Sequence, residues 1–144
     1  MSKSIPLVLF NASVVLAGIK SPSGGSAKIL SFCKEGKIIG LMSEVMVDEA
    51  MRNGPRVGAE PKDIEARIQN LNIRICPAPK SSMVDKFKKI VIDLGDAHVL
   101  ASANEQKVNF LVTLDKKHIL ILQEKISKYI IVSPGELISH LQKE

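Results

Sequence analysis

The sequence predicts an α/β domain in which a parallel sheet carries helices on both faces. Short apolar runs alternate along the chain with longer segments whose apolar residues recur at helical spacing, as is typical of such sheets. The first run, residues 5–10, is apolar on both faces, as expected of a strand buried in a parallel sheet. The chain has 144 residues, of which 45% are hydrophobic. This is enough for one core, so we expect a single domain over residues 1–144.

Residues with strong positional preferences mark the element boundaries of the first half. Gly36 is suited to end a helix, Ser43 to cap one at its N-terminus, and Pro61 to occupy a first helical turn. Loops are expected over residues 21–25 and 53–60. The expected elements after the first strand are a helix over residues 27–34, a strand over 37–42, a helix over 44–51, a helix opening at Pro61 with Ile64, Ile68 and Leu71 on one face, and a strand over 72–76.

Similar signals divide the second half. Ser82 and Asp85 resemble a capping box, and Ser133 with Glu136 forms another, with a proline at the first helical position. The expected elements are a helical segment opening after Ser82 with Met83, Phe87 and Ile90 on one face, a helix over 95–106, a strand over 109–114, a short helix over 116–124, a strand over 129–132, and a helix opening at Pro134.

Composition excludes several classes of function. Aromatic residues make up only 3% of the chain, which argues against a stacking platform for single-stranded bases. A net charge of +5 favours a polyanionic partner. Cys33 and Cys76 form no CxxC pair and are interpreted as reduced, buried thiols of a cytoplasmic protein. The apolar run over residues 5–19 is interrupted by Asn11 and Ser13 and is too short to span a membrane.

Three acidic residues lie on or beside hydrophobic elements. Asp96 falls within the apolar sector of its predicted helix, where a carboxylate is costly unless a positive group meets it. Glu49 lies at the edge of the apolar face of the 44–51 helix, and Asp115 ends the apolar run that begins at residue 110. Such residues are candidates for metal binding or catalysis.

These acids can converge at one rim of the sheet. Ligands of open α/β sheets bind beyond the carboxyl ends of the strands, where Asp115 and Asn11 follow two of the predicted strands. Glu49 and Asp96 lie on helices that follow connectors. Crowded carboxylates repel one another, and a divalent cation relieves that repulsion. Mg²⁺ or Mn²⁺ suits oxygen ligands and can activate water for attack on a phosphodiester.

Five segments of the chain form an ordered pattern: residues 10–15 (FNASVV), 21–25 (SPSGG), 43–49 (SEVMVDE), 95–101 (GDAHVLA) and 111–116 (LVTLDK). Together they resemble the PIN domain family, in particular its branch of toxin components of toxin–antitoxin systems. The resemblance covers roughly residues 7–141. It implies a three-layer α/β/α sandwich with a five-stranded parallel sheet. It also implies an acidic site that binds Mg²⁺ or Mn²⁺, and a hydrolytic ribonuclease activity.

The resemblance also assigns roles to individual residues. The second, third and fourth acids of the family fall on Glu49, Asp96 and Asp115, which it implies are the metal ligands and catalytic acids. Ser13 and Thr113 match polar residues that position a ligand or a substrate phosphate.

Asn11 stands where the family has its first acid. An amide oxygen can still coordinate Mg²⁺, but it offers a neutral ligand. Loss of even a supporting group of a metal site costs about 10–100-fold in affinity or activity. We therefore expect weak metal binding and slow or absent cleavage.

Other residues near these motifs have ordinary interpretations. His98 projects away from the acids on its helix and is interpreted as a solvated surface residue. His118 follows Asp115 closely, but an ordinary surface position is favoured. Asp93 is interpreted as a loop carboxylate. Residues 21–28 do not match a phosphate-binding loop, because no lysine follows a second glycine directly.

Three functions compete at this point. The first is a metal-dependent endoribonuclease, a toxin with RNA as substrate, an antitoxin as partner and a homodimeric assembly. The second is a catalytically degenerate PIN domain that binds RNA or a protein partner, which Asn11 favours. The third is a receiver-like phosphorelay domain, which lacks support because the acidic pair expected after its first strand is missing.

Overall fold

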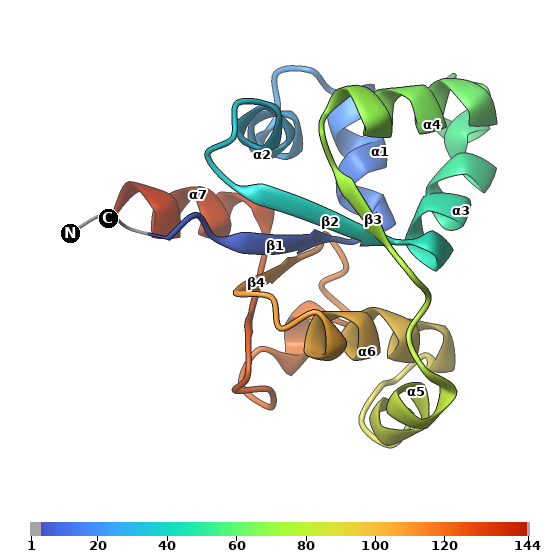
Figure 1. The fold of residues 1–144 in the computed structure, drawn as a ribbon, viewed down its shortest axis with the longest axis vertical. Helices are drawn as coiled ribbons and strands as arrows, with labels where there is room; N and C mark the ends of the chain where they lie inside the picture. The colour runs from blue at the N-terminus through green and yellow to red at the C-terminus, as the bar shows by residue number, and fades with distance from the viewer. Residues whose placement is uncertain (1–3, 144) are drawn as a thin grey trace.

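The computed structural model describes residues 4–143 and contains one sheet of five strands (Figure 1). The strand order is β3-β2-β1-β4-β5, and all neighbouring strands run parallel. The strands are β1 (Leu7–Phe10), β2 (Ile39–Ser43), β3 (Arg74–Cys76), β4 (Phe110–Val112) and β5 (Ile130–Val132). The predicted parallel α/β architecture is confirmed. The expectation of one domain over residues 1–144 stays a prediction, since residues 1–3 and 144 lie outside the described residues.

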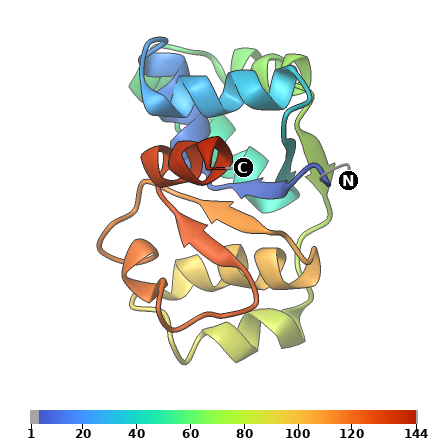
Figure 2. The ribbon, with the colours of Figure 1, turned by 90° about the vertical axis from the view of Figure 1, so that its left-hand side faces the viewer.

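Helices cover both faces, so the sheet is the middle of three layers (Figures 1 and 2). Right-handed crossovers place connections that run toward β3 on one face and those that run toward β5 on the other. The first face carries α1 (Ala12–Lys20), α2 (Gly25–Lys34), α3 (Glu44–Arg52), α4 (Pro61–Asn70) and the C-terminal α7 (Pro134–Gln142). The opposite face carries α5 (Ser81–Phe87) and α6 (Ala97–Glu105).

The core is aliphatic and centred on β1, as the low aromatic content requires. Val8, Leu9 and Phe10 are fully buried because β1 is the middle strand and is covered on both faces. Gly40 in β2 permits close packing: a Cβ there would lie 2.5 Å from the Phe10 ring and 2.6 Å from the Cys33 Sγ. The close packing of β1 and β2 therefore restricts the positions of the residues that follow these strands.

Helix α1 was not expected from the sequence. Its inward residues Ala12, Val14 and Val15 are buried against the sheet and neighbouring helices, so it lacks the polar stripe of a surface helix. The apolar run from residue 5 to 19 therefore contains a strand and a helix, and the boundary between them lies at Asn11. Asn11 has extended backbone angles, and its carbonyl accepts the first helical hydrogen bond from Val14 N at 3.0 Å.

Two predicted helical features are wrong. Residues 116–124 form turns and one 3₁₀ segment, η3 (Leu120–Leu122), because the Asp115 carbonyl accepts hydrogen bonds from both Ile119 N and Leu120 N and winds the chain tightly. The Ser82–Asp85 capping box is not formed. Helix α5 begins at Ser81 without a side-chain cap, and Asp85 pairs with Lys88 at 3.0 Å.

Other boundary predictions are confirmed. Ser43 Oγ accepts a hydrogen bond from Met46 N at 3.2 Å, and Ser133 with Glu136 forms a complete capping box. Gly36 has a φ of +79° after α2, the left-handed geometry that suits glycine. The predicted 95–106 helix is divided into a 3₁₀ turn, η2 (Leu94–Asp96), and α6. Across residues 4–143, none of the helices has the length and apolar character needed to cross a membrane.

Candidate metal-binding active site

The carboxyl ends of β1 and β4 form the centre of the candidate site. These strands are neighbours, with Phe10 in register with Val112. The chain leaves β1 toward α1 on one face and leaves β4 toward η3 on the opposite face (Figure 2). In open α/β sheets a crevice is expected where neighbouring strands diverge in this way, and ligands bind there. Asn11 and Thr113 follow the two strands directly.

Buried polar side chains tie the two strand ends together. Asn11 Nδ2 donates a hydrogen bond to Thr113 Oγ1 at 2.9 Å, and both residues are buried. Thr113 Oγ1 also accepts from Asp115 N at 3.1 Å, and Ser13 Oγ accepts from Leu114 N at 3.4 Å. The hydroxyl groups of Ser13 and Thr113 therefore hold the backbone of the turn that carries Asp115.

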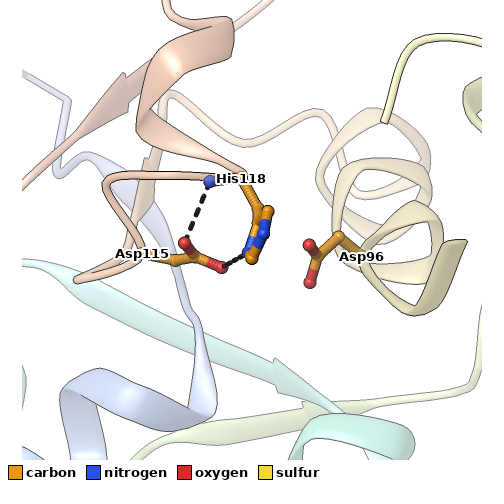
Figure 3. Close-up of side chains that lie close together, drawn as sticks. All are labelled: Asp96, Asp115 and His118. Carbon is orange, nitrogen blue, oxygen red and sulfur yellow. Dashed lines mark hydrogen bonds and ion pairs between the residues drawn. The ribbon is translucent and has the colours of Figure 1, made fainter. Parts of the chain in front are cut away.

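Asp115 and His118 form a paired unit on this turn. Asp115 Oδ1 accepts a hydrogen bond from the backbone N–H of His118 at 3.0 Å, and Asp115 Oδ2 lies 3.2 Å from His118 Nδ1 (Figure 3). Both side chains are half-buried. The pairing orients the imidazole ring without removing either group from the crevice.

Asp96 approaches Asp115 and His118 from another element of the fold. It lies at the junction of η2 and α6, and its side chain points toward His118 and Asp115 (Figure 3). One potential ligand atom from each of these three residues lies within 4.8 Å of the others. Asp96 Oδ2 is buried and has no hydrogen-bond partner among residues 4–143. A buried carboxylate oxygen without a partner is unfavourable unless a cation meets it.

The electrostatics of Asp96 reflect this crowding. Burial, and next the nearby negative charge of Asp115, raise the pKa of Asp96 from 3.8 to about 6. Asp93 and Glu49 raise this pKa further, and His118 opposes the shift. Strongly perturbed carboxylates in a crevice are typical of functional sites.

Glu49 lies farther from the centre than the other two acids. It is half-buried on α3, and burial raises its pKa while the charge of Arg52 partly offsets the rise. Its charge affects the pKa of Asp96, yet it stands outside the group of three ligand atoms within 4.8 Å. The structure therefore brings Asp96 and Asp115 together with His118, and places Glu49 at the margin.

This donor set fits a divalent cation. Two carboxylates in mutual repulsion, one with an unsatisfied buried oxygen, gain most from a doubly charged ion. The imidazole of His118 adds a nitrogen donor at the same place.

Two histidines differ from their sequence-based interpretation. His118 belongs to the crevice, and the signal for it was the spacing from Asp115, since a strand-end aspartate caps the N–H three residues later. His98 is half-buried on α6 rather than solvated, and burial lowers its pKa. Its Nδ1 is buried without a hydrogen-bond partner in the described part of the chain.

Comparisons with known proteins agree with this architecture. The family profile described as PIN domain matches residues 7–117. No curated protein matches the sequence.

Similar solved structures share the fold at low sequence identity. PAE2754 from Pyrobaculum aerophilum has a TM-score of 0.62 and 16% identity, covering 96% of this chain and 97% of that one. VapBC2 from Rickettsia felis, bound to a DNA fragment from its promoter, has a TM-score of 0.63 and 12% identity, covering 88% of this chain and 98% of that one. VapC20 from Mycobacterium tuberculosis, a sarcin-ricin loop cleaving toxin, has a TM-score of 0.55 and 14% identity, covering 76% and 91%.

Proposed function

The chain belongs to the PIN domain family, and we propose that it is a Mg²⁺- or Mn²⁺-dependent endoribonuclease, the toxin of a toxin–antitoxin pair. The single observation that carries this proposal is the approach of Asp96 and Asp115 near the carboxyl ends of β1 and β4, with a buried oxygen of Asp96 that has no partner among residues 4–143. A half-buried like-charged pair with one buried, unpaired oxygen is unfavourable for folding alone, which supports a bound cation at this place.

The described residues suggest how the site would work. Asp96 and Asp115 would hold the ion, with Glu49 as a third ligand and the Asn11 side-chain oxygen as a neutral fourth. A bound divalent ion supplies an activated water for phosphodiester hydrolysis and neutralises developing charge. Ser13 and Thr113 would act by fixing the turn that carries Asp115, or by contacting a substrate phosphate.

Charge supports RNA as the substrate. The chain carries a net charge of +5, and Lys116 and Lys117 are exposed on the turn directly after Asp115. Cations beside an acidic centre can hold the phosphates on either side of the cleaved bond. The likeness to VapBC2 and to the loop-cleaving toxin VapC20 supports an antitoxin partner and a toxin role. We place the protein in the cytoplasm as a single domain that forms a homodimer.

The decisive experiment is RNA cleavage by wild-type protein and by Asp96→Asn, with Mn²⁺, Mg²⁺ or EDTA. We expect Asp96→Asn to lose about 100-fold or more of the rate, beyond the loss seen for a supporting group of a metal site. Asp85→Asn is the matched control, because Asp85 is exposed and pairs only with Lys88 among its described contacts. Cleavage that survives EDTA, or equal rates in wild type and Asp96→Asn, would contradict the proposal.

One observation favours a second function, a PIN domain that binds RNA or a protein without cutting. Asn11 removes a negative charge from the site, and its amide nitrogen is engaged by Thr113. Tight, salt-dependent RNA binding without metal-stimulated cleavage would select this function. Asp96-dependent cleavage would exclude it.

A further inference from the structure

Asp115 fixes the position of His118 through both of its carboxylate oxygens. One oxygen accepts the backbone N–H of His118 and the other lies 3.2 Å from Nδ1. The next residue, Ile119, is fully buried, and its N–H bonds to the Asp115 carbonyl at 3.2 Å. The imidazole ring is therefore held in place before any ligand binds.

The same pairing determines which ring nitrogen is free. An ionised carboxylate can only accept hydrogen bonds, so the tautomer of His118 that pairs with an ionised Asp115 is the one with its proton on Nδ1. In a neutral imidazole the lone pair then lies on Nε2. Histidines that bind metals show this arrangement, with the second nitrogen donating to a carboxylate.

We propose that Nε2 of His118 is a ligand of the divalent ion, and that the resulting carboxylate–imidazole site prefers a transition-metal ion to Mg²⁺. The inference rests on the proposed metal-dependent function and concerns which ion the site takes. In this metal site, His118 supplies a ligand where the neutral amide of Asn11 would bind the ion only weakly.

The distances are compatible with this role. Metal–ligand bonds of about 2.1 Å place two ligand atoms on opposite sides of one ion about 4.2 Å apart. One carboxylate oxygen each from Asp96 and Asp115 and one ring nitrogen of His118 lie within 4.8 Å of one another, close to the span of a single ion. Asp96 Oδ2, which is buried and has no hydrogen-bond partner among the described residues, is an independent sign that this position suits a cation.

The donor chemistry sets the preference. Oxygen-only sites suit Mg²⁺, which also demands a regular octahedral shell. An imidazole nitrogen shifts preference toward Fe²⁺, Co²⁺, Ni²⁺ and Zn²⁺, and affinity rises along the first-row series beyond Mn²⁺.

A different role for His118 predicts the opposite result. A protonated imidazole between two carboxylates would act as an internal counter-ion and compete with the metal (Figure 3). Removing that counter-ion would strengthen metal binding, whereas removing a ligand would weaken it. The sign of the change therefore separates the two roles.

The test uses the full chain loaded with Mn²⁺ and then with Co²⁺. Electron spin-echo envelope modulation of bound Mn²⁺ reports a coordinated nitrogen, and labelling with [¹⁵N]histidine changes that modulation without any substitution. Calorimetric titrations with Co²⁺ and Mg²⁺ compare wild type with His118→Ala and His118→Gln. His140→Ala is the matched control, because His140 is exposed on α7 and packs against Phe110.

We expect histidine nitrogen modulation in wild type, and a Co²⁺ affinity at least about tenfold lower in both His118 variants, with little change for Mg²⁺. The proposal is overturned if the modulation is absent, or if Co²⁺ binds the His118 variants equally well or more tightly. Asp96-dependent cleavage alongside that negative result would leave the proposed function standing. Absence of any metal binding would overturn both.

Discussion

At the scale of single residues, Asp96 identifies the candidate site because the burial and crowding of its carboxylate are energetically unfavourable. Its carboxylate is drawn into the crevice beside Asp115, and its pKa rises to about 6. Because this value lies above the unfolded one, the folded state holds the proton more tightly than the unfolded chain does. The free energy of unfolding therefore falls as pH rises from about 4 to about 6. Above that window the stabilisation that comes from protonated Asp96 is absent.

Asp96→Asn should therefore stabilise the metal-free protein at neutral pH. A shift from 3.8 to about 6 corresponds to at most about 3 kcal/mol at pH 7.5, since each pKa unit represents about 1.36 kcal/mol. At pH 4 the folded wild type carries a protonated Asp96, and the difference should disappear. Urea unfolding in EDTA at several pH values measures this, with Asp85→Asn as control. A variant less stable than wild type at pH 7.5 would contradict the assignment.

Asn11 is the second informative residue, because it places a neutral amide at a buried position directly after β1, where the proposed metal site would gain from a charge. Asn11→Asp should raise metal affinity at least about tenfold and accelerate RNA cleavage, since it adds an anionic ligand beside Asp115. Metal titration and single-turnover cleavage measure the two effects. Asn104→Asp, on α6 beside Met83, is the matched control. Equal affinity and equal rates in wild type and Asn11→Asp would count against the role assigned to Asn11.

At the scale of elements, the turn after β4 does most to organise the site. Thr113 Oγ1 accepts hydrogen bonds from Asn11 Nδ2 and from Asp115 N, so one buried hydroxyl joins β1 to the residue that carries the charge. The Asp115 side chain then accepts the N–H of His118. A short chain of side-chain to backbone bonds thus replaces the helix predicted over residues 116–124.

Thr113→Val should weaken both the fold and the site. The isosteric side chain leaves the buried Asn11 Nδ2 and the half-buried Asp115 N–H without their acceptor, at a cost of about 1–3 kcal/mol. Thr113→Ser keeps the hydroxyl and should lose only about 0.8 kcal/mol for the missing methyl group. Urea unfolding and metal titration of both variants provide the comparison. A valine variant as stable as the serine variant would show that the hydroxyl does not hold the turn.

Element prediction failed where tertiary contacts override local pattern. Helix α1 is covered by the sheet and by other helices, so its sequence lacks the polar face that signals a helix. Ser82 and Asp85 have the residue types of a capping box, but α5 begins two residues earlier than that box requires, and Asp85 pairs with Lys88 instead. Ser133 and Glu136, in contrast, satisfy each other locally, and their pattern was sufficient.

At the scale of the whole molecule, the parallel sheet was predictable because buried strands need continuous apolar runs. Four of the five strands lie within a run recognised from the sequence, and β2 extends one residue beyond its run, to Ser43. Periodicity alone was not sufficient to predict where the site residues lie. The positions of Asp96 and Asp115 follow from strand ends and helix starts, whereas the role of His118 depends on a turn that only the folded chain defines.

The hydrogen bond between Asn11 and Thr113 joins residues 102 positions apart, and this separation has a consequence in time. A ribosome adding about 5–20 residues per second needs about 5–20 s to travel that stretch of message. Until then β4 cannot dock beside β1, and a nascent chain carries no assembled crevice. Translation itself therefore imposes a delay between the synthesis of the first site residue and the appearance of a working centre.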